Sequence, residues 1–160
     1  MAPLKVVIVG GGLAGSLLAN GLLESDISVT VYERDDESAN RKGYQIRLGA
    51  HALVGLKACL SQQQLEYVLS KFGRTGGVVA SAPALFDKNM KLQLDLSKFP
   101  AYTKSAPINR AVLRDVLQAP LRDAKVLQYG KKFLRYEVLE ATGLSRIRAY
   151  FEGGHVDEAD

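Results

Sequence analysis

A glycine-rich turn near the start of the chain limits its fold more than any other feature. The apolar run Leu4–Val9 leads into the turn Gly10–Gly15, which reads Gly-Gly-Gly-Leu-Ala-Gly and is followed by a helical pattern. A second apolar run, Ile27–Tyr32, ends at Glu33. A strand, a G-x-G-x-x-G turn, a helix and a second strand that ends at an acid together predict a βαβ unit that binds a dinucleotide.

Three glycines of the turn, Gly10, Gly12 and Gly15, each have a separate expected task. Gly10 allows a tight turn after the first strand, and Gly12, which has no side chain, lets a pyrophosphate approach the backbone. Gly15 lets the helix pack close to the strand. The amide groups of Leu13–Gly15 begin the helix and favour anionic phosphate. We expect Glu33 to accept hydrogen bonds from the ribose hydroxyls of adenosine. An acid at this position disfavours a ligand with a 2′-phosphate, such as NADP. The alternative is a glycine turn that binds nothing.

Composition narrows the class of protein. The 160 residues are 47% hydrophobic and 24% charged, which is typical of one ordinary globular domain. The net charge of +4 is dispersed, with no basic stripe interleaved with aromatic residues, so we expect no nucleic-acid partner. The single cysteine, Cys59, favours a reducing compartment, and we expect a cytoplasmic location. Residues 4–9 are too short for a membrane span, and we expect no membrane segment in this chain.

The rest of the chain is predicted from its hydrophobic periodicity. Helices are expected at 13–23, 50–60, 62–72 after the cap Ser61, and 110–122 after the cap Asn109, where Pro120 can shorten the last one. Residues 77–86 and 91–96 predict a half-buried hairpin, and residues 126–129, 132–139 and 145–151 predict a β-meander. The leucines of the first helix are expected to form its packing side; these are Leu17, Leu18, Leu22 and Leu23. His155 follows a Gly-Gly turn and is expected to be exposed.

The long insertion after Glu33 distinguishes the chain from a simple NAD-binding domain, which would continue βαβαβ with short connections. The glycine turn, Glu33-Arg34, the segment Gly43–Leu48 and the segment Ile108–Leu113 occur in this order. Together they resemble the N-terminal part of class A FAD-dependent monooxygenases. These are the aromatic-hydroxylase-like enzymes, such as p-hydroxybenzoate and salicylate hydroxylases and their fungal relatives in secondary metabolism. The resemblance runs over essentially the whole chain.

The resemblance implies an α/β fold: a Rossmann-like FAD-binding βαβ unit with inserted helices, a hairpin and a β-meander. The implied domain is 1–160, the N-terminal part of an FAD-binding domain, with a substrate-domain-like hairpin at about 76–106. It also implies roles for single residues. Arg34 would lie near the adenine or ribose, Gln45 and Arg47 near the flavin, and Arg110 would reach the cofactor with its fork of donors. The pyrophosphate would be held by Gly10, Gly12, Leu13, Ala14 and Gly15, and the adenosine ribose by Glu33.

The activity implied for a complete enzyme is a flavoprotein oxidoreductase reaction. NAD(P)H reduces FAD, O₂ is activated, and one oxygen atom is transferred to a hydrophobic or aromatic small molecule. The family's Gly-Ala-Asp-Gly segment would begin where this sequence stops, at Asp160. We therefore expect a truncated chain that is inactive alone, with a partner chain or self-association completing its sheet. Two alternatives remain: a non-catalytic nucleotide-binding or interaction protein, and another FAD-dependent oxidoreductase.

Overall fold

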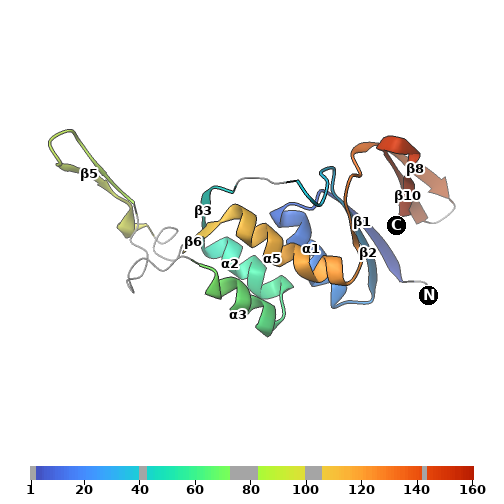
Figure 1. Ribbon diagram of the computed structural model, residues 1–160, viewed down its shortest axis with the longest axis horizontal. Helices are drawn as coiled ribbons and strands as arrows, with labels where there is room; N and C mark the ends of the chain where they lie inside the picture. Colours follow the sequence, from blue (N-terminus) through green and yellow to red (C-terminus); the bar gives the residue numbers. More distant parts are fainter. Residues whose placement is uncertain (1–2, 40–42, 73–82, 100–105, 142–143) are drawn as a thin grey trace. The chain divides into compact units, whose positions relative to one another are not determined.

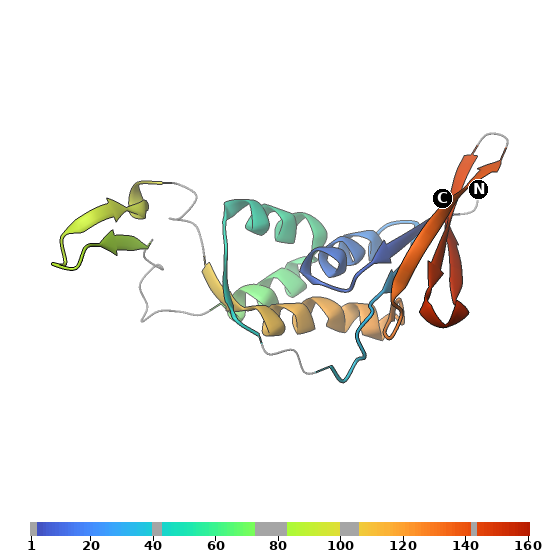
Figure 2. The ribbon, with the colours of Figure 1, turned by 90° about the horizontal axis from the view of Figure 1, so that it is seen from above.

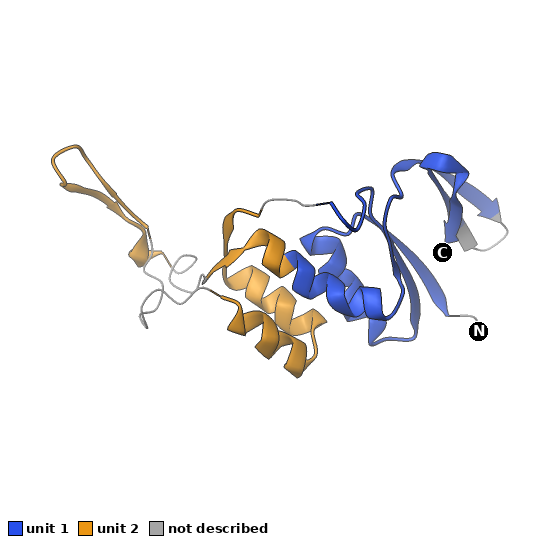
Figure 3. Ribbon diagram, in the orientation of Figure 1, with its two compact units in different colours: residues 1–42, 114–160 blue, residues 43–113 orange. Residues whose placement is uncertain are grey.

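The computed structural model describes residues 3–39, 43–72, 83–99, 106–141 and 144–160. The chain divides into two compact units (Figure 3). Unit 1 consists of residues 1–42 and 114–160, and unit 2 consists of residues 43–113. The predicted α/β fold class, with a βαβ start, is confirmed.

A parallel sheet forms the centre of unit 1. Strand β1 (Leu4–Val9) pairs in parallel with β2 (Ile27–Tyr32) along its full length, and helix α1 (Leu13–Leu23) connects them (Figure 1). A short strand, β7 (Leu127–Gln128), pairs in parallel with the other edge of β2, which gives the order β1–β2–β7. The carboxyl ends of β1, β2 and β7 therefore lie at one edge of the sheet, which is the edge where ligands bind in open α/β folds.

Helices cover one face of this sheet. Helix α5 (Arg110–Asp123) begins in unit 2 and continues, from Arg114, in unit 1. Its later part and α1 supply apolar side chains to a core with all three strands; the buried members are Ile8, Ala19, Val29, Val31, Leu121 and Leu127. The period-2 alternation of each strand places these residues on the helix-covered face.

The buried face of α1 is small and polar rather than rich in leucine. Its buried residues are Ser16, Ala19 and Asn20, whereas Leu18 is 50% exposed, so the predicted leucine packing side is wrong for Leu18. The Nδ2 atom of Asn20 donates to the backbone oxygens of Ser16 (2.7 Å) and Leu117 (2.8 Å). Small side chains let α1 approach closely, and these hydrogen bonds satisfy the buried amide.

The opposite face of the parallel sheet is covered by a β-meander that differs in part from the predicted one. The strands predicted at 132–139 and 145–151 are present, but the strand predicted at 126–129 joins the parallel sheet as β7, and the third meander strand was not predicted. Strands β8 (Phe133–Ala141), β9 (Leu144–Phe151) and β10 (Val156–Ala159) form an antiparallel sheet, with the 3₁₀ turn η2 (Glu152–Gly154) between the last two. Two of its buried residues, Ala149 and Phe151, pack on Tyr32 of β2. The two ends of the chain lie close together (Figure 2), and the Asp160 amide donates to the Lys5 carbonyl oxygen at 3.0 Å.

Among its described residues, unit 2 contains the two-stranded ribbon β3–β6, helices α2 and α3, and a hairpin. Strand β3 (Gln45–Leu48) pairs antiparallel with β6 (Ala106–Asn109), a pairing that the sequence did not predict. Helices α2 (Ala50–Cys59) and α3 (Gln62–Ser70) follow the predicted ranges closely. The predicted cap Ser61 accepts from the Gln64 amide at 3.3 Å, and the Gln64 side chain accepts from the Ser61 amide at 2.9 Å. This reciprocal pair is a capping box.

The predicted hairpin is present, but its leucines are exposed. Strand β4 (Ala84–Phe86) pairs antiparallel with β5 (Leu92–Asp95), and the 3₁₀ turn η1 (Leu96–Lys98) follows. Residues 77–82 of the predicted first strand lie outside the described residues. Leu92 and Leu94 are 50% and 41% exposed, so the half-buried face predicted from their alternation is absent from the described part.

Helix α5 begins and ends close to its predicted limits. The Asn109 side-chain oxygen accepts from the Ala111 amide at 2.8 Å and the Val112 amide at 3.4 Å, which confirms the predicted cap. Pro120 does not shorten the helix, which continues to Asp123. The last turn persists because the Ala124 amide donates to the Pro120 oxygen at 3.0 Å and Leu121 is fully buried.

Candidate nucleotide-binding site

The glycine turn joins β1 to α1 with the geometry that its residues suggested. Gly10 has a φ of +104°, which residues other than glycine rarely adopt. Its amide donates to the backbone oxygen of Tyr32 at 2.7 Å. A Cβ on Gly15 would lie 2.1 Å from the Gly10 oxygen. Gly10 therefore allows the turn, and Gly15 allows the close approach of helix and turn, as predicted.

Gly12 leaves open space at the start of α1. It occupies the N-cap position, no side chain caps the helix there, and a Cβ on Gly12 would meet nothing within 4 Å. Leu13 is half-buried and Ala14 is exposed. The first amides of an α-helix have no partner within the helix, and the helix dipole favours negative charge beside them. This opening therefore suits a phosphate group that approaches the backbone.

Glu33 is bound directly to the glycine turn. Its Oε2 atom accepts from the Gly11 amide at 3.0 Å, and its Oε1 atom accepts from the Asp35 amide at 3.0 Å. The side chain is half-buried. A carboxylate oxygen can accept two hydrogen bonds, so each oxygen keeps capacity for a ligand hydroxyl.

A cleft of about 320 Å³ opens beside Glu33 in unit 1. Arg34 lies at this cleft with an exposed side chain, and its Nε atom is 3.7 Å from Asp35 Oδ1. The cleft combines an acid, three cations and apolar surface, and is lined by Val9, Gly10, Tyr32, Glu33, Arg34, Lys131, Lys132 and Phe133.

Lys131 and Lys132 are cleft residues that were not among the predicted site residues. The Lys131 amide donates to the backbone oxygen of Glu33 at 2.8 Å, and the Lys131 side chain is half-buried. Lys132 is exposed and its Nζ atom lies 3.4 Å from Glu152 Oε1. The parallel pairing of β7 with β2 would have revealed both lysines, because the carboxyl ends of parallel strands share one edge.

Three predicted cofactor residues lie in unit 2, near the start of α5. Gln45 and Arg47 are exposed on β3, and Gln45 is the strand partner of Asn109. The Arg110 amide donates to the Tyr44 oxygen at 3.0 Å, and the guanidinium carbon lies 6.0 Å from the centre of the Tyr44 ring. The β3–β6 ribbon thus brings Gln45 and Arg110 close together in the fold.

Gly43 permits this arrangement. A Cβ at Gly43 would lie 2.1 Å from Asn109 Oδ1 and 2.7 Å from the Ala111 Cβ. The chain before β3 therefore passes the start of α5 more closely than any residue with a side chain allows.

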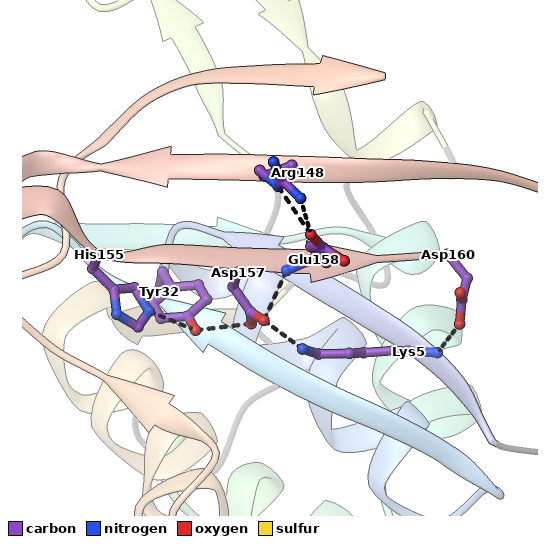
Figure 4. A network of polar contacts seen from close by, with 7 residues as sticks. All are labelled: Lys5, Tyr32, Arg148, His155, Asp157, Glu158 and Asp160. Carbon is purple, nitrogen blue, oxygen red and sulfur yellow. Dashed lines mark hydrogen bonds and ion pairs between the residues drawn. The ribbon is translucent and has the colours of Figure 1, made fainter. Parts of the chain in front are cut away.

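A polar network joins β1 and β2 to the end of the meander (Figure 4). The Tyr32 hydroxyl donates to Asp157 Oδ2 at 2.9 Å, and the Lys5 ammonium forms an ion pair with Asp157. Because the single hydroxyl hydrogen goes to Asp157, the His155 Nε2 atom, 3.0 Å away, donates to the Tyr32 oxygen. His155 is half-buried and its ring lies 5.6 Å from the Phe151 ring, so the prediction of an exposed histidine is wrong.

The network shifts two pKa values. Burial, together with the nearby Asp157 carboxylate, raises the pKa of Tyr32, whose hydroxyl remains protonated. Burial alone would raise the pKa of Asp157, but hydrogen bonds from Lys5 and Tyr32 outweigh it and lower that pKa. Asp157 is therefore a carboxylate that binds β10 to both β1 and β2.

One protein-family model matches part of the chain. Residues 8–72 match the model of the NAD(P)-binding Rossmann-like domain, which includes the glycine turn and Glu33. None of the helices described in the structure is long and apolar enough to cross a membrane.

The chain is also similar to individual monooxygenases. The FAD-dependent monooxygenase dbaB of Emericella nidulans is 33% identical over 94% of this chain and 37% of its own length. The 6-hydroxynicotinate 3-monooxygenase of Pseudomonas fluorescens is 29% identical over 98% of this chain and 38% of its own length. A solved structure from Photorhabdus luminescens, assigned as an FAD-containing monooxygenase, is 26% identical, with a TM-score of 0.79 over 98% of this chain and 38% of that one. The chain is therefore similar to the N-terminal parts of FAD-dependent monooxygenases, and it spans only 17% to 38% of the length of the curated relatives it matches.

Proposed function

We propose that the chain is the FAD-binding portion of a flavin-dependent monooxygenase. The complete protein would use NAD(P)H and O₂ to hydroxylate or epoxidise a hydrophobic or aromatic small molecule. The observation that carries the proposal is the open backbone at Gly12, at the start of α1, beside an acid already bound to the same turn. Monooxygenase relatives support it further.

The residues of unit 1 fit the adenosine diphosphate half of FAD. The amides that begin α1 would hold the pyrophosphate, and Glu33 would accept the ribose hydroxyls. Arg34, with Lys131 as an added candidate, would contact the adenosine from the walls of the cleft. The predicted pyrophosphate residues remain Gly10, Gly12, Leu13, Ala14 and Gly15.

The residues of unit 2 are proposed to serve the flavin half. Gln45, Arg47 and Arg110 would contact the cofactor, with Arg110 using its permanent charge and its fork of donors. Bound FAD would supply the redox chemistry, while these side chains would bind and orient it. As domain assignment, we propose an FAD-binding domain over 1–160 with a substrate-domain-like hairpin at about 76–106.

The visible spectrum of the purified chain tests the proposal directly. A chain that binds oxidised FAD is yellow, and added FAD raises its unfolding temperature because the ligand binds only the folded state. A colourless chain whose unfolding temperature does not change with FAD would contradict the proposal. We expect no hydroxylation by this chain alone, and an assay with NAD(P)H and aromatic substrates checks that expectation.

Two substitutions test the residue assignment. Glu33→Ala and Arg110→Ala should each weaken FAD binding by roughly tenfold or more, since each removes a charge-assisted hydrogen bond. Glu37→Ala, at an exposed position near Glu33, is the control. Isothermal titration with FAD measures the three affinities. Wild-type affinity in both site variants would remove the assignment.

The edge of β1 supports a further part of the proposal. In the described sheet β1 is an edge strand, and a second cleft beside it is lined mainly by apolar residues, among them Val6, Val7 and Ile147. We infer that another polypeptide segment, from a partner chain or a second copy, completes this sheet. Light scattering of the purified chain measures its mass; a strict monomer would contradict self-association.

A cytoplasmic location also remains a proposal, supported by the single cysteine.

One competing function is a non-catalytic nucleotide-binding or interaction protein. The cleft at Glu33 is consistent with it, since adenosine diphosphate alone would occupy that part of the site. Titration with ADP and FAD separates the two: equal affinity for both favours this competitor, and a clear preference for FAD favours the flavoprotein. Another FAD-dependent oxidoreductase would also bind FAD, and product analysis of the complete protein distinguishes it.

A further inference from the structure

The buried side chain of Gln118 contacts the glycine turn from the protein interior. Gln118 lies on the part of α5 that belongs to unit 1 and is 6% exposed. Its Nε2 atom donates to the Gly11 oxygen at 2.5 Å, and its Oε1 atom accepts from the Tyr129 hydroxyl at 3.1 Å. Because Tyr129 donates to the amide oxygen, the amide nitrogen is held toward Gly11.

The Gly11 carbonyl oxygen has a second donor. The Ser16 hydroxyl on α1 donates to it at 3.1 Å, so two buried side chains fix its direction. On its other side, Gly11 donates its amide hydrogen to Glu33. A Cβ on Gly11 would lie 3.2 Å from both Gln118 Nε2 and the Glu33 Cβ. Gly11, which the sequence reasoning gave no task, is thus held tightly between α5 and the acid.

The direction of this carbonyl determines the direction of the next amide. The described peptide bonds are all trans, and in a trans peptide the C=O and the following N–H point in opposite directions. The Gly12 N–H therefore points away from Gln118 and Ser16. No described residue accepts a hydrogen bond from it, and the space beside Gly12 is open.

We propose that Gln118 is a positioning residue for the nucleotide-binding turn. By holding the Gly11 carbonyl toward the interior, it directs the Gly12 amide toward the phosphates of the ligand. The inference rests on the proposed function, because it takes the pyrophosphate of FAD as that ligand. Tyr129 acts one step further back by fixing the orientation of the Gln118 amide.

Titration of the full chain with FAD and with ADP tests this proposal. Gln118→Met keeps the length of the side chain but removes the donor, and we expect roughly tenfold weaker binding of both ligands. Tyr129→Phe keeps the Gln118 donor and frees its orientation, so its effect should be smaller. The matched control is Gln63→Met, the same change at an exposed position of α3. Circular dichroism confirms that each variant is folded at the temperature of the titration.

A pH profile separates positioning from packing. In Gln118→Glu, the ionised carboxylate cannot donate to the Gly11 oxygen, whereas the protonated acid can, and burial raises the pKa of such a group toward neutrality. The affinity of Gln118→Glu, taken as a ratio to wild type at each pH, should therefore recover as the pH falls from about 8 to about 5. The same ratio for Gln118→Met should stay flat.

A measurement without ligand completes the test. In ¹⁵N-labelled protein, the amide resonance of Gly12 should shift in Gln118→Met and stay unchanged in Gln63→Met. Three results would each overturn the positioning role of Gln118 without affecting the proposed function. They are wild-type affinity in Gln118→Met, an unshifted Gly12 resonance in that variant, and an affinity ratio for Gln118→Glu that does not change with pH. A wild-type chain that binds neither FAD nor ADP would overturn the proposed function as well.

Discussion

At the scale of single residues, the glycines of the nucleotide-binding turn have separate physical reasons to be glycine. Gly10 is required by its backbone torsion and Gly15 by the collision that a Cβ would cause, whereas a Cβ on Gly12 would enter the open space that we propose for the phosphates. Gly11 fits between Gln118 and Glu33. The four positions carry the same amino acid, but their substitutions should fail in different ways.

Gly15→Ala should destabilise unit 1. The new Cβ would lie 2.1 Å from the Gly10 oxygen, so α1 must move away from the turn, at a cost of about 2 kcal/mol or more in unfolding free energy. Urea denaturation measures the change. Gly12→Ala is the matched control: its Cβ meets nothing within 4 Å and its φ is −72°, so the folded state should keep its stability and lose affinity for FAD. A Gly15→Ala variant as stable as wild type would contradict the close approach.

At the scale of helices and strands, the sequence predicted the elements whose signals are local. The capped starts of α3 and α5 followed from Ser61 and Asn109, because a cap requires only nearby side-chain and backbone atoms. The β1–α1–β2 unit followed from its glycines and its apolar strands.

The elements that were missed depend on distant partners. Strand β7 was predicted as a strand at 126–129, but its parallel pairing with β2 was not, because that place is set by the packing of Leu127 in the core rather than by a local pattern. The packing side of α1 was predicted only in part: Leu22 and Leu23 pack on the core. Ser16 and Asn20 were missed because they are buried through hydrogen bonds to Gly11 and Leu117, which no hydrophobic periodicity reveals. Lys131 and Lys132 were overlooked because they follow β7, and their place at the cleft depends on the pairing of β7 with β2.

Asn109→Ala should destabilise α5. The substitution removes the acceptor for the Ala111 and Val112 amides, and loss of such a cap costs about 1 kcal/mol. Thermal or urea denaturation of the purified variant measures this loss. Asn109→Asp, which keeps an acceptor oxygen, should restore most of it. Asn89→Ala, in the exposed turn of the β4–β5 hairpin, serves as the control. Equal stability of Asn109→Ala and wild type would show that the cap contributes nothing.

At the scale of the whole chain, unit 1 is formed by the N-terminal and the C-terminal segments of the chain. Residues 1–42 supply β1, α1 and β2, and residues 114–160 supply the covering helix, β7 and the meander. Asp157 connects these two segments because it binds Lys5 of β1 and Tyr32 of β2. Its lowered pKa makes this connection sensitive to acid.

Asp157→Asn should lower stability at neutral pH and reduce its acid sensitivity. A carboxylate whose folded-state pKa is lowered contributes stability above its unfolded pKa, and that contribution disappears as the pH falls through the folded pKa. We expect a loss of about 1–2 kcal/mol at neutral pH, and this loss should shrink as the pH is lowered below about 4, the usual pKa of an aspartate. Urea denaturation at neutral and at acidic pH measures the change.

Glu152→Gln provides the comparison for Asp157→Asn. It breaks only the exposed ion pair with Lys132, and surface pairs contribute little to stability. If the difference between Asp157→Asn and wild type were the same in acid as at neutral pH, the assignment of Asp157 as the acid-sensitive connection would be wrong.

The distance in sequence between β2 and the meander has a consequence during synthesis on the ribosome. Tyr32 and its hydrogen-bond partner Asp157 are 125 residues apart. At the usual speed of translation, roughly ten seconds pass between their emergence. Throughout that time the face of β1 and β2 that Phe151 later covers is exposed to solvent. The nascent chain is therefore vulnerable to aggregation until the meander has been synthesised.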